Sequence, residues 1–249
     1  MRHDRDMGQF SGKGAIVTGG ARGIGRAIVR RLAADGAAVV FTYLNNEQAA
    51  KETAEETQAL AVRADQGSLA DLTRLFKAAD EFLGSGLDIV VCNAAEGLPV
   101  PFGDVTEEAY DRYMAVNAKG PFFTIQHAGA RLRDGGRIIT ISTANTRMHA
   151  PGGALYTGGK GAPENFTKVA AIVFGHRGIT ANIVSPGATD TELLRGANPG
   201  ATFEDTIAVT ALKRLGHPDD IASAVAMLAG PDAAWITGQN IAVDGGLMP

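Results

Sequence analysis

Short apolar runs alternate along the chain with longer segments in which apolar residues recur every three or four positions. The runs are typical of buried β-strands, and the periodic segments are typical of amphipathic helices. The predicted strands cover residues 13–18, 37–42, 60–63, 87–92, 137–142, 179–185 and 239–243. Strands that alternate with helices form βαβ units, whose right-handed crossovers place helices on both faces of a parallel sheet.

The predicted helices lie between these strands. They cover residues 23–35, 46–58, 68–82, about 106–132, a segment that ends at 173, and 218–229. We expect residues 186–206 to be irregular, because this segment is polar and lacks a helical period. No repeat or Pro/Ser-rich linker divides the chain. The pattern predicts one α/β domain over 1–249, a doubly wound parallel sheet of the Rossmann type with about seven strands.

Composition limits what the protein can be. Its 249 residues suffice for one large core, and 45% hydrophobic and 20% charged residues are ordinary for a globular enzyme. A net charge of −4 leaves no basic surface for nucleic acid, and no apolar run approaches the ~20 residues that span a membrane. The five histidines lack metal-ligand spacing, so no metal site is predicted. Residues 1–10 lack the apolar core of a secretory signal, so we expect a loose lead-in and a cytoplasmic protein.

A glycine-rich turn follows the first predicted strand and opens the first predicted helix. It reads TGGARGIG over residues 18–25. Glycines let backbone approach a phosphate, and the free N–H groups and dipole of a helix N-terminus favour its negative charge. We therefore expect Gly19, Gly23, Ile24 and Gly25 to bind a dinucleotide. A plain glycine-rich turn is the alternative that the loop alone leaves open.

The residues after the second predicted strand bear on which dinucleotide binds. A carboxylate there would hold the ribose 2′-hydroxyl of NAD, but Tyr43, Asn45 and Asn46 precede the first one, at Glu47. Arg22 lies inside the glycine loop, where a guanidinium suits a 2′-phosphate. The asparagine side chains can donate hydrogen bonds to the same group. These residues favour NADP(H), unless Arg22 is only a solvated loop cation.

A tyrosine and a lysine four residues apart begin the long helix before the sixth strand. Tyr156 and Lys160 therefore face the same way. A nearby ammonium stabilises a phenolate and lowers its pKa from about 10 toward neutral pH, which makes the tyrosine a general acid or base. Thr143 follows the fifth strand and Asn93 the fourth. Both belong to the carboxyl edge, where open parallel sheets bind their ligands.

With these motifs in order, the chain resembles the short-chain dehydrogenase/reductase family over about residues 13–246. TGGARGIG matches the family's TGxxxGxG, Tyr156 and Lys160 match its YxxxK, and ITGQNIAVDGG matches its last strand. The resemblance implies four catalytic residues, Asn117, Thr143, Tyr156 and Lys160. It also implies that Asp65, Gln66, Asn93, Ala94, Tyr156, Lys160, Pro186, Gly187 and Thr191 contact the cofactor.

The resemblance further implies a mechanism and an assembly. Tyr156 would protonate a carbonyl oxygen while NADPH delivers hydride to the carbon, and Lys160 would lower the pKa of Tyr156 and bind the nicotinamide ribose. Thr143 would orient the carbonyl, and Asn117 would hold the water that reprotonates the tyrosine. The chain is most similar to the 3-oxoacyl-ACP-reductase-like members, which implies a small-molecule carbonyl substrate and a homotetramer.

Three departures from the family pattern leave other functions open. Thr143 replaces a serine, and its neighbour Ser142 would point to the other face of the strand. Ala95 replaces a glycine, and Pro163 lies in the catalytic helix, where a proline removes a hydrogen bond and kinks the chain. The alternatives to a reductase are an NADPH-binding sensor or scaffold with little turnover and an NAD-linked alcohol dehydrogenase. We expect residues 188–215 to close over the site as a lid.

Overall fold

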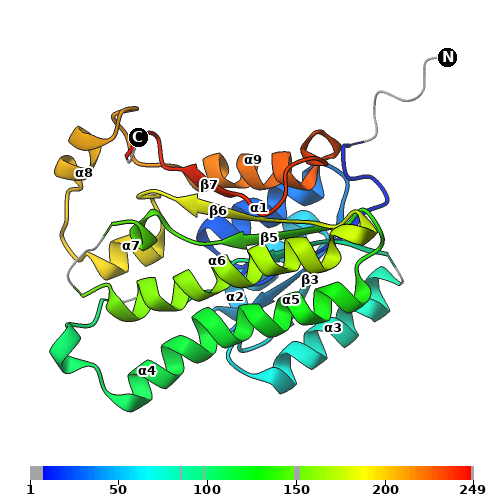
Figure 1. Cartoon of the computed structure of the whole chain (residues 1–249), viewed down its shortest axis with the longest axis horizontal. Helices are drawn as coiled ribbons and strands as arrows, with labels where there is room; N and C mark the ends of the chain where they lie inside the picture. Colours follow the sequence, from blue (N-terminus) through cyan, green and yellow to red (C-terminus); the bar gives the residue numbers. More distant parts are fainter. Residues whose placement is uncertain (1–7, 85, 98, 149–151, 248–249) are drawn as a thin grey trace.

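A parallel β-sheet lies at the centre of the computed structural model, which describes residues 8–84, 86–97, 99–148 and 152–247 (Figure 1). In these residues the sheet has seven strands in the order β3-β2-β1-β4-β5-β6-β7, and every neighbouring pair is parallel. The strands are β1 Gly14–Val17, β2 Ala38–Tyr43, β3 Leu60–Arg63, β4 Leu87–Cys92, β5 Arg137–Ile141, β6 Thr180–Pro186 and β7 Asn240–Val243. The strand order reverses between β1 and β4, which opens a crevice at their carboxyl ends.

Helices cover both faces of this sheet (Figure 1). The helices are α1 Gly23–Ala34, α2 Glu47–Thr57, α3 Leu69–Leu83, α4 Glu107–Met114, α5 Gly120–Arg131, α6 Ala154–Phe174, α7 Glu192–Ala197, α8 Glu204–Val209 and α9 Pro218–Ala229. Helices α1, α2 and α9 pack on one face, and α3, α5 and α6 pack on the other. The predicted α/β fold, one doubly wound domain, is confirmed.

Each face of the sheet buries its own apolar core. Successive residues of a strand point to opposite faces, so Val17 of β1 lies in the core with Ile28 of α1. Its neighbour Ile16 lies in the second core, with Leu72 and Phe76 of α3. Because both faces are buried, the strands are continuous apolar runs, and this is why the sequence pattern located them.

Two segments differ from the predicted elements. The helix predicted over about 106–132 contains a π-helical turn, η2 (Ala115–Lys119), between α4 and α5. A π turn shifts the hydrogen-bond partners by one residue without requiring particular side chains. Residues 186–206, predicted to be irregular, include α7 and the start of α8. Six residues make fewer than two helical turns, which is too short for a recognisable apolar period.

Helix α6 runs from Ala154 to Phe174 without a break, although Pro163 lies inside it. Proline has no N–H to donate to the carbonyl of Gly159, four residues earlier. The proline itself is buried, and the Thr167 hydroxyl donates to its carbonyl over 2.8 Å. The lost hydrogen bond therefore does not end the helix that carries Tyr156 and Lys160.

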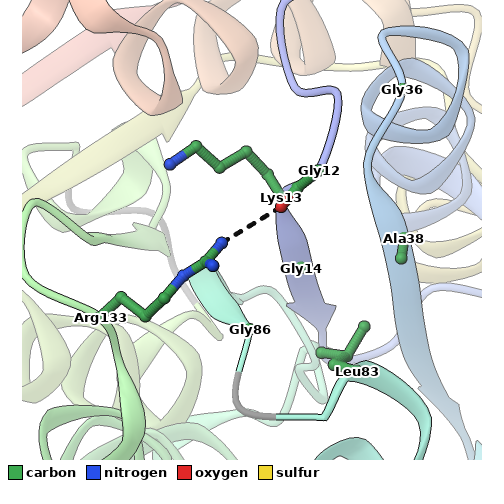
Figure 2. A pocket seen from close by; sticks show the side chains of 8 residues that line it. All are labelled: Gly12, Lys13, Gly14, Gly36, Ala38, Leu83, Gly86 and Arg133. Carbon is green, nitrogen blue, oxygen red and sulfur yellow. Dashed lines mark hydrogen bonds between the residues drawn. The ribbon is translucent and has the colours of Figure 1, made fainter.

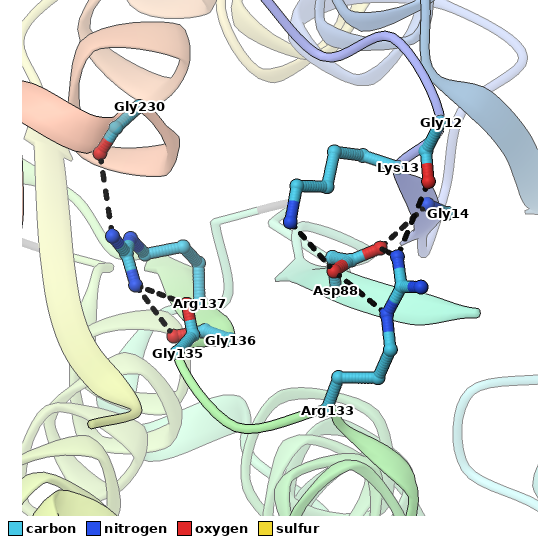
Figure 3. Close-up of polar contacts among 9 residues, drawn as sticks. All are labelled: Gly12, Lys13, Gly14, Asp88, Arg133, Gly135, Gly136, Arg137 and Gly230. Atoms are coloured by element: carbon cyan, nitrogen blue, oxygen red, sulfur yellow. Dashed lines mark hydrogen bonds and ion pairs between the residues drawn. The ribbon is translucent and has the colours of Figure 1, made fainter. Parts of the chain in front are cut away.

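A buried carboxylate joins the elements at the amino edge of the sheet. Asp88 of β4 accepts hydrogen bonds from the Gly14 N–H over 2.9 Å, from Lys13 Nζ over 3.1 Å and from the Arg133 guanidinium (Figure 3). Arg133 also donates to the carbonyl of Gly12 across a small pocket (Figure 2). Burial alone would raise the pKa of Asp88, but the hydrogen bonds from Arg133, Gly14 and Lys13 outweigh it and lower the pKa.

The described chain begins close to the core. Residues 1–7 of the predicted lead-in lie outside the described residues, whereas Phe10 is buried and its N–H donates to the carbonyl of Asp35 over 2.7 Å. In the part of the chain that the structure describes, no helix combines the length and the apolar character needed to cross a membrane.

Candidate active site

A cleft lies at the carboxyl ends of the strands. Figure 1 shows α7 and α8 at this end of the sheet. Its volume is about 670 Å³, within the range of small-molecule sites. Every predicted site residue except Asn117 lines it. These residues are Gly19, Arg22, Gly23, Ile24, Gly25, Tyr43, Asn45, Asn46, Asp65, Gln66, Asn93, Ala94, Thr143, Tyr156, Lys160, Pro186, Gly187 and Thr191. The fold thus brings together residues from all parts of the sequence.

The glycine loop forms the wall of the cleft between β1 and α1. Gly19 and Gly23 have φ values of +71° and +52°, which side chains rarely adopt. A side chain at Gly25 would overlap the carbonyl of Gly19, so this glycine allows the loop to fold tightly onto the helix. Helix α1 has no side-chain cap and no acidic residue in its first turn. Its N-terminal N–H groups are therefore suited to bind a phosphate.

Asn93, at the end of β4, holds the glycine loop in place. Its Nδ2 donates to the carbonyls of Thr18 and Gly19 over 2.9 and 3.1 Å. The backbone N–H groups of Asn93 and Ala94 donate to the Thr18 hydroxyl over 3.0 and 3.1 Å. The side chain of Asn93 thus holds the glycine loop in place at the edge of the cleft.

The end of the cleft beside β2 has a surplus of hydrogen-bond donors. Arg22 and Asn45 are exposed on its rim. Asn46 uses its Oδ1 to cap α2, accepting from the Ala49 N–H over 3.0 Å, which leaves its amide N–H groups as donors. Glu47, the first carboxylate after β2, forms an ion pair with Lys51. This geometry suits a phosphate better than a sugar hydroxyl that needs a free carboxylate.

An ion-pair network crosses the cleft next to β3. Asp65 accepts hydrogen bonds from the Gly67 N–H over 2.8 Å and from Arg112 over 2.6 Å. The same guanidinium donates to Glu96 over 2.6 Å. Burial would raise the pKa of Asp65, but the hydrogen bonds from Arg112 and Gly67 lower it. Gln66, also predicted to contact the cofactor, directs its amide to the Thr124 hydroxyl of α5.

Three predicted catalytic side chains meet on the opposite wall. Tyr156 and Thr143 share a hydrogen bond between their hydroxyl groups. Lys160 is 4% exposed, and its Nζ donates to the carbonyl of Ile141 over 2.7 Å. Tyr156 and Lys160 come from α6, and Thr143 follows β5, so the contact between β5 and α6 sets the geometry of the group.

Burial determines the proton affinities of this group. It raises the pKa of Tyr156, and the hydrogen bond with Thr143 only partly opposes the rise. It lowers the pKa of Lys160 to about 8. Burial thus moves the pKa of Tyr156 in the direction opposite to the predicted one, and Lys160 is not among the groups that act on that pKa. The phenol stays protonated at neutral pH.

Asn117 lies behind the cleft wall, in the π-helical turn η2. Its Oδ1 accepts from the Glu96 N–H over 3.0 Å, and its Nδ2 donates to the Glu96 carbonyl over 2.8 Å. The side chain is fully buried. A Cβ atom at Gly159 would lie 2.7 Å from the Cβ of Asn117, so α6 passes very close to η2. The side chain of Asn117 thus anchors the loop after β4.

Ser142, the neighbour of the Thr143 departure, and Ala95, a second departure, both line the cleft. The hydroxyl of Ser142 donates to Glu164 of α6 over 2.5 Å, whereas Thr143 provides the hydrogen bond to Tyr156. Ala95 lines the cleft two residues before Gly97. A Cβ at Gly97 would lie 3.2 Å from the Tyr156 ring, so the loop after β4 packs directly against that tyrosine.

Apolar side chains form an apolar wall of the cleft. They are Met148, Leu193, Leu194, Phe203 and Leu247, most of them from the segment of α7 and α8. The Thr191 hydroxyl accepts from the Leu194 N–H over 3.2 Å and so caps α7. Thr191, predicted as a cofactor residue, therefore also fixes where this apolar wall begins.

Sequence reasoning missed three charged residues of the site. Arg112 lies 47 positions from Asp65 and 16 positions from Glu96, so no local spacing connects these residues. Glu164 could have been found, because it lies four residues after Lys160 and therefore on the same face of the predicted helix.

Known proteins are similar to this chain in sequence and in fold. A profile of the family described as Enoyl-(Acyl carrier protein) reductase matches residues 19–248. The hydroxynaphthalene reductase-like protein Arp2 of Metarhizium acridum is 39% identical over 255 residues, with 95% of each chain covered. A short-chain dehydrogenase/reductase of Pestalotiopsis microspora is 40% identical over 258 residues, with 96% of each chain covered.

A solved structure extends the comparison. A blue fluorescent protein from a metagenomic library, crystallised in complex with NADPH, is 41% identical and matches with a TM-score of 0.91. The match covers 97% of the present chain and 100% of the other.

Proposed function

Because the chain belongs to the short-chain dehydrogenase/reductase family of oxidoreductases, we propose that it reduces a ketone or 3-oxoacyl group to an alcohol with NADPH. The observation that carries the proposal is the meeting of Thr143, Tyr156 and Lys160 in the cleft that the glycine loop lines. A proton donor and a cation beside a dinucleotide loop suit hydride transfer to a carbonyl.

The residues of the cleft suit NADP(H). The uncapped N-terminus of α1 would bind the pyrophosphate, and Arg22 with the amide of Asn46 would bind the 2′-phosphate. Asp65 and the backbone at Gln66 would contact the adenine, and Pro186, Gly187 and Thr191 would lie beside the nicotinamide. The structural neighbour that holds NADPH supports this assignment. When bound, NADPH would supply the hydride.

The protein's own residues would supply the proton that the carbonyl oxygen needs. Tyr156, whose pKa lies above its ordinary value, is protonated at neutral pH and would donate its proton to the carbonyl oxygen. The Thr143 hydroxyl would donate a second hydrogen bond to that oxygen and stabilise its developing charge. Lys160 would bind the nicotinamide ribose. Asn117 would reach a relay water through its backbone, since its side chain is committed to Glu96.

The apolar wall favours a carbonyl compound that carries apolar or aromatic groups. The segment 188–215, which contributes Leu193, Leu194 and Phe203, would close over such a substrate as a lid. The name of the hydroxynaphthalene reductase-like relative supports the inclusion of aromatic ketones among the candidates.

The test is oxidation of NADPH, followed by absorbance, with a panel of ketones, quinones, an aromatic ketone and a 3-oxoacyl thioester. Tyr156→Phe should lower kcat by about 10² or more, because the proton donor is lost. Tyr110→Phe, at an exposed tyrosine of α4, is the control and should leave kcat unchanged. Turnover that survives in Tyr156→Phe would overturn the mechanism.

Cofactor preference tests the role of Arg22 separately. We expect tighter binding of NADPH than of NADH, and Arg22→Ala should weaken NADPH binding about tenfold or more without affecting NADH. Arg30→Ala removes an exposed guanidinium that pairs with Glu56 and is the matched control. A clear preference for NADH would instead support the NAD-linked alcohol dehydrogenase.

A second candidate function is binding of NADPH with little turnover. It is favoured by the printed name of the NADPH-bound neighbour, which describes fluorescence and not a reaction. Bound NADPH whose fluorescence rises in the cleft, without oxidation by any carbonyl of the panel, would support this sensor or scaffold reading.

We also propose a homotetramer. Apolar side chains are exposed on neighbouring helices, including Phe122 of α5 and Val169, Ile172 and Val173 of α6. An apolar surface of this kind is typical of a subunit interface. Size-exclusion chromatography with light scattering should give about four times the 25.8 kDa chain mass, and a monomer would refute the assembly.

A further inference from the structure

Glu164 of α6 connects two hydroxyl groups on either side of Thr143. Ser142 Oγ donates to Glu164 Oε1 over 2.5 Å, and Thr146 Oγ1 approaches the same oxygen at 2.9 Å. Ser142 directly precedes Thr143, and Thr146 ends the short helical turn η3 (Ala144–Thr146) that Thr143 caps. One carboxylate oxygen therefore holds both ends of the loop that presents the Thr143 hydroxyl.

The loop has further local contacts that depend on this hold. The Thr146 hydroxyl also lies 3.0 Å from the carbonyl of Thr143, so its one proton is shared between that carbonyl and Glu164. The Thr143 hydroxyl accepts from the Asn145 N–H over 3.2 Å and hydrogen-bonds Tyr156. A shift of the loop would therefore move the Thr143 hydroxyl relative to Tyr156.

Glu164 also affects the charge of Lys160, one helical turn earlier. The groups that act on the buried ammonium are the Ile141 carbonyl of β5, the Cys92 thiol of β4 and the Glu164 carboxylate of α6. Burial raises the pKa of the Cys92 thiol to about 12, so this thiol is neutral near neutral pH. Of the two titratable groups, Glu164 alone then carries a negative charge that favours the protonated lysine.

We propose that Glu164 is a positioning residue that holds the Thr143 loop against Tyr156 and keeps Lys160 charged. The proposal rests on the reductase function above and adds a residue to its machinery. Glu164 acts through Thr143 and Lys160, since its carboxylate is occupied by Ser142 and Thr146.

A neighbouring contact between the same strand and helix provides a control. Thr140 and Thr167 share a buried hydrogen bond of 2.7 Å between their hydroxyls. This pair also joins β5 to α6, but it does not contact Thr143, Tyr156 or Lys160 in any described hydrogen bond. Thr167→Val removes it with little change of shape, and so measures what loss of a purely structural contact does.

The first experiment separates the two roles of Glu164 by steady-state kinetics at pH 7. Glu164→Leu removes the acceptor and the charge and should lower kcat about tenfold or more, with the KM for NADPH changed much less. Glu164→Gln retains an oxygen that can accept from both hydroxyls and should keep kcat within about threefold. Thr167→Val should leave kcat unchanged. A kcat for Glu164→Leu equal to that of Thr167→Val would overturn the proposal.

The second experiment is the pH profile. If activity requires the Lys160 ammonium, kcat/KM of the wild type should fall as pH rises through about 8. Glu164→Gln removes the charge that favours the ammonium, so the fall should move to lower pH by about one unit. Ser142→Ala retains the charge and should not move it. Superimposable profiles for wild type and Glu164→Gln would refute the electrostatic role.

A readout without turnover separates this proposal from the reductase function. The Kd of NADPH, measured by its fluorescence across the same pH range, should show the same displacement in Glu164→Gln if Lys160 binds the nicotinamide ribose. Wild type that binds NADPH but oxidises it with no carbonyl would refute the reductase, and the displacement would still test Glu164. If Glu164→Leu fails to fold, the proposal is tested by the pH profiles of Glu164→Gln and Ser142→Ala, of which only the first should be displaced.

Discussion

Lys160 is a charged side chain in a buried place, and this has a thermodynamic consequence. Burial lowers its pKa from 10.5 to about 8, so between these pH values the unfolded chain binds more protons than the folded one. Stability should therefore rise with pH across that window, and the full cost of the buried charge, about 3 kcal/mol, should apply below pH 8. Lys160→Met should raise the Tm at pH 7 while abolishing turnover.

Thermal denaturation at pH 7 and pH 10 measures this effect. The Tm gain of Lys160→Met should shrink at the higher pH, where the wild-type lysine is largely neutral. Lys168→Met, at an exposed lysine of the same helix, should change the Tm little at either pH. A Lys160→Met protein less stable than wild type at pH 7 would show that the Ile141 hydrogen bond outweighs the burial cost.

The contributions of the Thr143 hydroxyl and of its methyl group to catalysis can be tested separately. Thr143→Val removes the hydrogen bond that lowers the pKa of Tyr156 and the donor for the carbonyl oxygen, so kcat should fall about 10²-fold. Thr143→Ser keeps the hydroxyl and should stay within about threefold of wild type. Equal kcat values for the valine and serine variants would remove Thr143 from the catalytic group.

At this scale, the sequence predicted which residues gather but not how they interact. The spacing of Tyr156 and Lys160 placed both on one face of α6. It carried no information on their burial, which reverses the expected pKa shift of the tyrosine. The Arg112 contacts with Asp65 and Glu96 were likewise invisible, since they join elements distant in sequence.

Among elements, the close approach of α6 to the π turn η2 depends on one glycine. A Cβ at Gly159 would lie 2.7 Å from the Cβ of Asn117, whereas nothing described lies within 4 Å of the Cβ position at Gly158 or Gly161. Gly159→Ala should therefore displace Asn117 and destabilise the fold by about 1–3 kcal/mol through overpacking. Gly158→Ala and Gly161→Ala should stabilise it by about 0.5–1 kcal/mol, as alanine favours a helix.

Chemical denaturation of the three alanine variants measures these differences, and kcat should fall only for Gly159→Ala. A Gly159→Ala protein as stable as Gly161→Ala would show that η2 can move aside without lowering the free energy of unfolding. This contact also explains a limit of sequence analysis. The glycines at 158, 159 and 161 look alike in the sequence, and only the packing of α6 on η2 distinguishes them.

Elements with long apolar runs or a full helical period were predictable from the sequence, and shorter ones were not. All seven strands of the described sheet were located, because burial on both faces makes the central strands largely apolar runs. Helices α7 and α8, of six residues each, have no room for a period. Their caps, Thr191 among them, depend on backbone geometry that residue types alone do not determine.

Over the whole molecule, the two edges of the sheet have different roles. The carboxyl edge carries the cleft, which many polar side chains line. The amino edge is held together by Asp88, whose carboxylate joins β1, β4 and the segment before β5 through Gly14, Lys13 and Arg133 (Figure 3). The pattern of apolar runs does not reveal this role, because Asp88 interrupts a strand that otherwise reads as apolar.

Asp88→Asn should therefore destabilise the protein without altering the cleft. The substitution leaves Lys13 and Arg133 without their counter-charge, but both cations are about half exposed. We accordingly expect a loss of about 2 kcal/mol, or roughly 4–8 °C in Tm, less than for a fully buried pair. Asp134→Asn removes a carboxylate that is 78% exposed and pairs with Arg177, and it should change the Tm little.

The pH dependence of this difference identifies its cause. The folded-state pKa of Asp88 lies below its ordinary value of 3.8, so its stabilisation is present above about pH 4 and is lost as pH falls through the folded-state pKa. The Tm gap between wild type and Asp88→Asn should stay constant from pH 7 to 5 and narrow below pH 4. A gap that persists unchanged in acid would mean that shape, and not charge, holds the amino edge together.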